Sequence, residues 1–111
     1  GDAILLGRRK EDLVFGGLWE PPGYDSAHER KHEASTVGAT LGVRLRAANE
    51  RGTVRHVLSH RRMEVRVYSG ALASAVARAS GPEYERFALV ERSKLGSLGL
   101  STLARKILAL C

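Results

Sequence analysis

The residues best suited to chemistry are gathered between Arg55 and Arg62. This segment reads Arg-His-Val-Leu-Ser-His-Arg-Arg, so two histidines bracket a serine and arginines stand on both sides. A serine hydroxyl both donates and accepts hydrogen bonds, and a guanidinium binds phosphate oxygens through two parallel hydrogen bonds. Apolar and polar residues alternate from Met63 to Tyr68, which predicts a strand directly afterwards. The pattern favours recognition of a polar, anionic ligand at the tip of a hairpin.

The overall charge also favours an anionic partner. The chain has 111 residues with 18 Lys and Arg against 12 Asp and Glu, and 14 of the cations are arginines. This balance favours nucleic acid as the partner, and the alternative is a solvated basic surface without a partner. The candidate phosphate contacts are Arg55, Arg61, Arg62 and, as weaker candidates, Arg8 and Arg9.

The periodicity of the chain predicts one domain, residues 1–111, of α+β class. Expected strands cover residues 3–7, 43–45, 53–59, 61–68 and 87–90. One helix is expected to begin at Ser26 and to stop at Gly42, and a second is capped by Ser101. Turns are expected at residues 8–12 and 49–52. A mixed sheet flanked by helices accommodates these elements.

A histidine pair upstream matches a zinc-binding pattern but lacks its partners. His28-Glu29-Arg30-Lys31-His32 has the HExxH spacing. A zinc protease also needs a third ligand, and residues 36–43 contain no histidine. Cys111 is the only cysteine, so the chain offers no disulfide and no set of thiolates for a metal or an iron–sulfur cluster. We therefore expect no metal site and an exposed, charged start of a helix.

Two segments together resemble a known family. Gly17-Leu18-Trp19-Glu20-Pro21-Pro22-Gly23, followed by residues 55–62, resembles the C-terminal domain of MutY-type adenine DNA glycosylases. The last part of the chain, from Phe87 onward, is similar to the way this domain closes. The resemblance implies a Nudix-like fold, an α/β/α sandwich, that inspects 8-oxoguanine in DNA.

The resemblance assigns roles to three residues. Leu58 matches a phenylalanine of the family loop, Ser59 matches the hydroxyl that hydrogen-bonds 8-oxoguanine, and His60 matches the histidine that follows. Leu58 is the departure, because leucine can wedge between bases but cannot stack on them.

The carboxylates of a working Nudix enzyme are missing. Alignment of the Nudix box to Gly42-Val43 puts Ser35-Thr36 in place of its Arg-Glu pair and Ala39-Thr40 in place of its Glu-Glu pair. Magnesium needs about one or two carboxylates in addition to substrate oxygens. We therefore expect no catalytic residue and no metal in this chain.

The resemblance also implies partners and a setting. The chain starts at Gly1 without a methionine, so we expect a fragment of a longer bacterial glycosylase. The N-terminal domain of that parent would remove adenine, as an N-glycosidic hydrolase, and would carry the iron–sulfur cluster. Expected partners are double-stranded DNA with 8-oxoguanine opposite adenine and that N-terminal domain, in the bacterial cytoplasm near the nucleoid. No apolar run approaches the roughly 20 residues of a membrane span.

Two other functions remain open from the sequence. The chain could be a Nudix hydrolase of oxidised nucleotides, or a protein-interaction module with a basic surface. The missing metal carboxylates count against the hydrolase, and the basic segment 55–62 counts against the interaction module.

Overall fold

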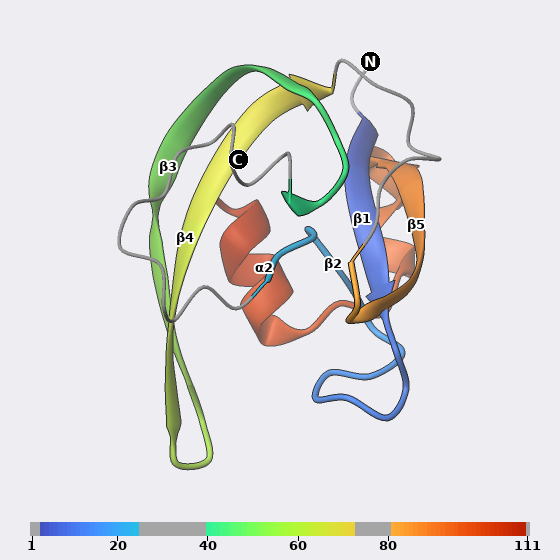
Figure 1. Cartoon of the computed structure of the whole chain (residues 1–111). Coiled ribbons are helices and arrows are strands. Elements are labelled where there is room, and N and C mark those ends of the chain that lie inside the picture. Colours follow the sequence, from blue (N-terminus) through green and yellow to red (C-terminus); the bar gives the residue numbers. More distant parts are fainter. Residues whose placement is uncertain (1–2, 25–39, 73–80, 111) are drawn as a thin grey trace.

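The computed structural model describes residues 3–24, 40–72 and 81–110 of the chain. The described elements, in chain order, are β1 Ala3–Arg9, β2 Trp19–Glu20, β3 Leu45–Leu58, β4 Arg61–Leu72, β5 Tyr84–Glu91, the 3-10 helix η2 Arg92–Ser97 and α2 Thr102–Leu108. They form a three-stranded sheet in the order β2-β1-β5 and a two-stranded sheet of β3 and β4 (Figure 1). All pairings within these sheets are antiparallel. The expected α+β class is confirmed.

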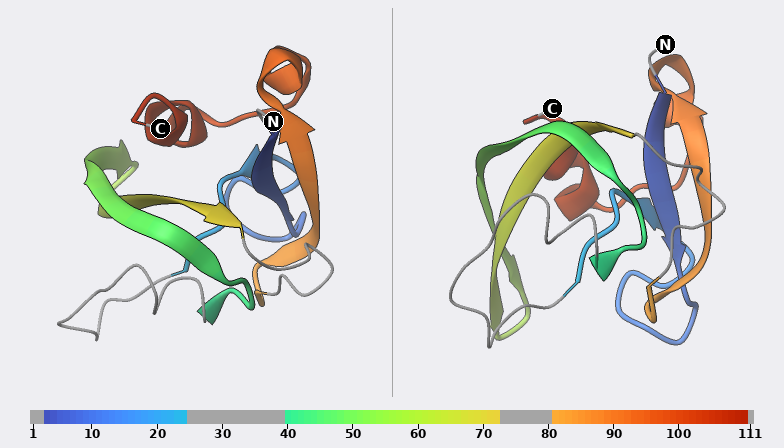
Figure 2. Two further views of the ribbon diagram at one scale, coloured as in Figure 1. Left: turned by 90° about the horizontal axis from the view of Figure 1, so that it is seen from above. Right: turned by 45° about the horizontal axis from the view of Figure 1, so that its top comes forward.

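The β3–β4 hairpin is long and curved, and α2 lies on its concave side (Figure 2). Val54 and Val67 of the hairpin are buried against Leu103 of α2. The partly buried residues packed on this cluster are Phe15, Met63, Val65 and Ile107. The apolar residues of β4 therefore face α2, as their alternation in the sequence predicts.

One expected turn is wrong, because β3 continues through it. Residues 49–52 lie within β3, where the register with β4 shifts between Arg46 and Asn49 and again between Glu50 and Gly52. Such shifts are β-bulges, which bend a strand and increase its twist. Ala47, with φ 51°, and Gly52, with φ 142°, take the backbone through these irregularities. The turn-like composition of this stretch produces the bend that wraps the hairpin around α2.

β1 is the central strand of the second sheet and extends two residues beyond its predicted end. Leu6 is fully buried, and Gly7 lies beneath the ring of Tyr84 of β5. A Cβ at Gly7 would stand 2.6 Å from that ring, so only glycine fits. Arg8 and Arg9, which were expected in a turn, belong to β1, and the chain turns after them.

The C-terminal helix begins where the sequence predicts. The Ser101 hydroxyl accepts a hydrogen bond from the backbone N–H of Ala104 at 3.0 Å, which caps α2. The first predicted helix and the HExxH motif lie almost wholly outside the described residues. At its expected end, Thr40 is helical and Gly42 has φ 73°, the left-handed conformation of a helix stop.

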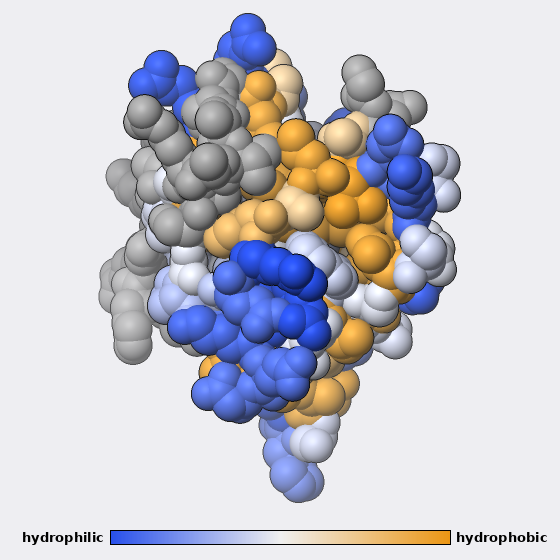
Figure 3. All heavy atoms as spheres, turned by 90° about the vertical axis from the view of Figure 1, so that its right-hand side faces the viewer, coloured by the Kyte–Doolittle hydropathy of each residue, from blue (hydrophilic) through white to orange (hydrophobic). Residues whose placement is uncertain are grey.

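The side of the molecule that β5 occupies shows an apolar area next to a hydrophilic cluster (Figure 3). Leu89 of β5 is 51% exposed. No helix among the described residues is long and apolar enough to cross a membrane.

Candidate nucleic-acid interface

The tip of the β3–β4 hairpin displays Ser59 and His60 to solvent. These two residues form the turn between Leu58 and Arg61, which pair across the strands. Ser59 has φ 54°, the positive φ that the first position of a tight hairpin turn requires. Glycine or asparagine takes this conformation easily, whereas serine there costs about 1 kcal/mol. No hydrogen bond of the Ser59 hydroxyl to another described residue is found, so the group is presented outward.

Leu58 stands just behind the tip and is half-buried. Its position in the register places it on the concave side, with Val54 and His56, which point toward α2. The leucine therefore supports the base of the turn, and Ser59 and His60 project beyond it.

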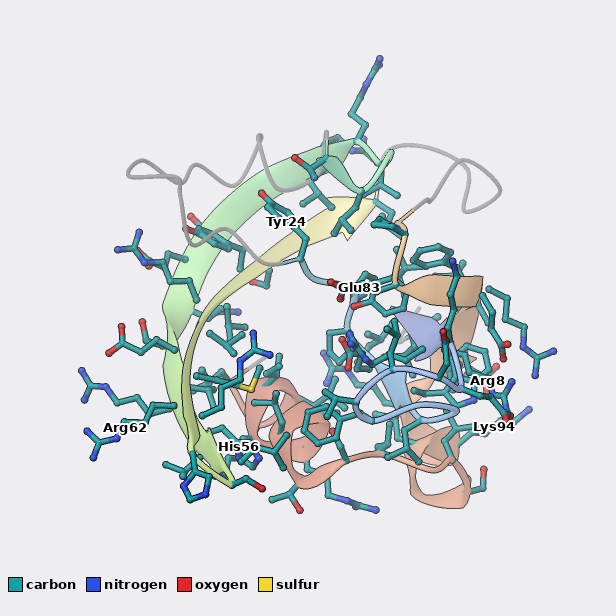
Figure 4. All side chains as sticks on the ribbon, turned by 60° about the horizontal axis from the view of Figure 1, so that its bottom comes forward. Arg8, Tyr24, His56, Arg62, Glu83 and Lys94 are labelled. Atoms are coloured by element: carbon teal, nitrogen blue, oxygen red, sulfur yellow. The ribbon has the colours of Figure 1, made fainter. Side chains whose placement is uncertain are left out.

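The convex face of the hairpin is basic. We define it by the side chains of three cross-strand pairs: Thr53 with Arg66, Arg55 with Glu64, and Val57 with Arg62. Figure 4 shows Arg62 pointing away from the hairpin on this face. Arg55 and Glu64 are 3.4 Å apart but 83% and 71% exposed, so their ion pair adds less than about 1 kcal/mol. Three arginines against one glutamate leave the face with a net positive charge.

The concave side near the tip carries a second group of polar side chains. Lys106 Nζ of α2 lies 3.2 Å from Nδ1 of His56. The ring of His56 packs against Phe15 with ring centroids 6.2 Å apart. His56 therefore stands between α2 and the loop that follows β1.

Arg8 and Arg9 lie elsewhere and are bound to carboxylates of their own domain. Arg8 forms ion pairs with Glu85 and with Glu11, and its Nε donates to the carbonyl of Gly17 at 3.1 Å. In Figure 4, Arg8 and Arg62 are on opposite sides of the molecule. The five predicted phosphate contacts therefore do not form one patch, and the internal partners of Arg8 disfavour a role in binding DNA.

Arg9 belongs to a polar cluster between β1, β2 and β5, which we call the clamp: Arg9, Glu20, Glu83 and Tyr84. Arg9 Nη1 lies 2.9 Å from Oε2 of Glu83 and 3.5 Å from Oε2 of Glu20. The Tyr84 hydroxyl donates to Glu20 Oε2 at 2.6 Å and accepts from the backbone N–H of Gly23 at 2.8 Å. The clamp thus fixes the Trp-Glu-Pro-Pro-Gly segment to β5.

Burial governs the protonation of the clamp. It raises the pKa of the Glu20 carboxyl, and the hydrogen bond from Tyr84 and the charge of Arg9 oppose this only in part. Burial and the adjacent Glu20 carboxylate also raise the pKa of Tyr84, so its hydroxyl stays protonated and keeps donating. Since these donors and acceptors are paired with one another, the clamp supports the fold rather than a ligand.

A comparison with protein families accounts for this arrangement. A family model described as the NUDIX domain matches residues 1–110. The chain belongs to the NUDIX family. A search of curated proteins found no match. The Nudix-like fold implied by the resemblance is therefore confirmed, and the clamp fastens the segment that leads into the expected NUDIX box.

No group of three or more His, Cys, Asp or Glu among the described residues is placed to hold a metal ion. Of the four box positions where the sequence lacks carboxylates, only Thr40 is described, and it is exposed.

The sequence did not point to three residues of the NUDIX domain that lie at this candidate interface. Arg66 joins the convex face, and the period-two alternation of β4 could have found it. Lys106 and Phe15 meet His56 only through the tertiary fold, since Lys106 is 50 residues away in the chain. No local pattern signals such a contact.

Proposed function

We propose that this NUDIX domain binds duplex DNA and reads 8-oxoguanine opposite adenine, as the recognition part of an adenine DNA glycosylase. It does not itself break a bond. The observation that carries the proposal is the exposed Ser59 hydroxyl at the hairpin tip, between Leu58 and His60 and with arginines behind it. The glycosylase domain of the same protein, with its iron–sulfur cluster, would remove the adenine, in the bacterial cytoplasm near the nucleoid.

The chemistry of the lesion suits a displayed hydroxyl. Guanine N7 accepts a hydrogen bond, whereas N7 of 8-oxoguanine carries a proton and donates. The hydroxyl of Ser59 serves as acceptor for that proton, and the tight turn places it at the exposed end of the hairpin. One neutral hydrogen bond of this kind contributes roughly 1 kcal/mol. It gives a preference of about fivefold for the lesion when the hydroxyl proton points away from N7, so that Ser59 does not donate to N7 of guanine.

The arginines of the convex face supply affinity rather than selectivity. Contacts to phosphate position a protein on DNA without reading its sequence. Each such contact releases counterions, so the affinity for DNA falls steeply as salt rises. The convex face carries Arg55, Arg62 and Arg66 with only Glu64 as a carboxylate, which fits this role.

The test compares two duplexes that differ only at the lesion. Affinity is measured for 8-oxoguanine opposite adenine and for guanine opposite adenine, with the wild-type chain and with Ser59→Ala. We expect a roughly fivefold preference for the lesion in the wild type, lost in the variant. Ser93→Ala is the matched control, because Ser93 is exposed on η2. An unchanged preference in Ser59→Ala would remove this residue from the reading site.

A second candidate, hydrolysis of oxidised nucleotides, is favoured by membership of the NUDIX family. The absence of carboxylates at Ser35, Thr36, Ala39 and Thr40 opposes it. With magnesium or manganese and 8-oxo-dGTP or ADP-ribose, we expect no hydrolysis above background. Metal-dependent turnover that disappeared on substitution of Glu29 and Glu33 would establish this function instead.

A further inference from the structure

Two donor side chains from distant parts of the chain meet close to the hairpin tip. Lys106 on α2 and His56 on β3 are in contact at 3.2 Å, on the exposed rim of the concave side. The imidazole is held from behind by Phe15, which packs on the core cluster around Val54 and Leu103. The ring therefore has a well-supported position, while the long side chain of Lys106 reaches it from solvent.

The contact between Lys106 and His56 determines which of their atoms can still bind a third group. An ammonium group has three N–H donors and no acceptor, so Nδ1 of His56 must be the acceptor in this contact. In the tautomer that accepts at Nδ1, the N–H donor of the ring is Nε2. The pair thus presents further N–H donors from both members, one positive charge and no acceptor to any third group. Such a set fits an anionic oxygen.

Among the described residues no ion pair joins Lys106 to a carboxylate; the loop that carries Phe15 contains Glu11, which is paired with Arg8, and Asp12. Between Thr53 and Tyr68 the hairpin contains one acidic residue, Glu64, which lies on the convex face beside Arg55. α2 contains none, and its last turn adds Arg105. Within the described residues, Lys106 therefore differs from Arg8 and Arg9, whose guanidinium groups are paired with carboxylates.

We propose that Lys106 and His56 together form a contact site for a backbone phosphate of the DNA strand whose damaged base meets Ser59. The choice of strand rests on the proposed function. His56 and Ser59 are three residues apart, which is roughly 10 Å along a strand. That distance corresponds to about three nucleotide rises of 3.4 Å. The site grips the backbone a few nucleotides from the lesion and sets the register in which Ser59 meets the base.

The test replaces the phosphates of the lesion strand one at a time by neutral methylphosphonates. Duplex affinity is measured by fluorescence anisotropy for the wild type and for Lys106→Gln at several salt concentrations. We expect Lys106→Gln to bind more weakly, with the wild-type advantage shrinking about threefold between 50 and 200 mM salt, as loss of one phosphate contact requires. One methylphosphonate, a few nucleotides from the lesion, should weaken the wild type and leave Lys106→Gln unaffected.

Lys94→Gln is the matched control, because Lys94 is exposed on η2 and lies far from His56 in Figure 4. Lys106→Arg should retain most of the affinity, and thermal unfolding of each variant verifies the fold. If Lys106→Gln matches Lys94→Gln at every salt while the wild type prefers the lesion, the phosphate site is overturned and the proposed function stands. If Lys106→Gln weakens binding but the wild type ignores the lesion, the phosphate site stands and lesion reading falls. A wild type that does not bind duplex DNA overturns both.

Discussion

Arg9 and Arg62 carry the same charge in opposite surroundings. Arg9 is 12% exposed, and its guanidinium faces two carboxylates of the clamp. Arg62 stands on the convex face, where Val57 is its cross-strand neighbour and Glu64 is the only acid. The two regions use arginine differently. The clamp pairs its charges within the domain, whereas the convex face exposes most of its charges to solvent.

Removal of the buried guanidinium should have the largest effect on stability. Arg9→Met leaves Glu20 and Glu83 without their cation, so we expect the free energy of unfolding to fall by about 3 kcal/mol. Arg62→Met should change it by less than about 0.5 kcal/mol. Urea unfolding measures both. Equal losses of unfolding free energy in the two variants would contradict the distinction between the clamp and the convex face.

Substitution of Tyr84, the tyrosine of the clamp, should have the second largest effect on stability. Tyr84→Phe removes the donor to Glu20 and the acceptor for Gly23, which we expect to lower the free energy of unfolding by about 2 kcal/mol. Tyr24→Phe is the control, because the buried hydroxyl of Tyr24 has no hydrogen-bond partner in the described structure. Its removal should leave stability equal or higher. A loss in Tyr24→Phe as large as that in Tyr84→Phe would contradict this account.

The clamp should also give stability a pH dependence. Burial raises the pKa of Glu20 above its ordinary value of 4.5, so the folded protein binds this proton more tightly than the unfolded chain does. The contribution of Glu20 to stability is therefore greatest below pH 4.5 and declines as pH rises through the raised pKa. Relative to Glu20→Gln, the wild type should lose under about 1 kcal/mol over this range, since the group is only partly buried. Urea unfolding across pH tests this, and a constant difference would refute it.

Substitution of arginines on the convex face should change the stability of the protein least but should clearly change its binding to duplex DNA. Arg62→Gln combined with Arg66→Gln should leave the free energy of unfolding within about 0.5 kcal/mol of the wild type. The slope of log affinity for duplex DNA against log salt should become shallower by about two. Arg92→Gln with Lys94→Gln, on exposed residues of η2, removes the same charge elsewhere and should leave that slope unchanged. Equal slopes in both double variants would mean that the hairpin is not the contact surface.

The sequence predicts those parts of the fold in which neighbours along the chain decide the structure. The alternation of β4, the exposed tip at Ser59 and the cap at Ser101 depend on local patterns, and all three are confirmed. Residues 49–52 have the composition of a turn, yet the pairing of β3 with β4 carries them through as bulges. These residues stay in the strand because β3 remains hydrogen-bonded to β4 on both sides of the bulges.

Long-range partners explain what the sequence could not reveal. The sequence makes Arg9 a weaker candidate for a phosphate contact, whereas in the structure it pairs with Glu83, which is 74 residues away. His56 and Lys106 are joined over 50 residues in the same way. Whether an arginine binds its own protein or a partner depends on which carboxylates the fold brings near it, and that information is absent from the local sequence.

The positive φ of Ser59 implies a trade-off that selection experiments can expose. Asparagine adopts this conformation with less strain than serine, so backbone energy and base reading favour different residues at one position. A library randomised at position 59 and sorted by protease resistance should be enriched in asparagine and glycine. The same library sorted by lesion binding should return hydroxyl residues. Opposite outcomes of the two sorts would show that serine is retained at this position for its hydroxyl, although other residues fit the backbone conformation better.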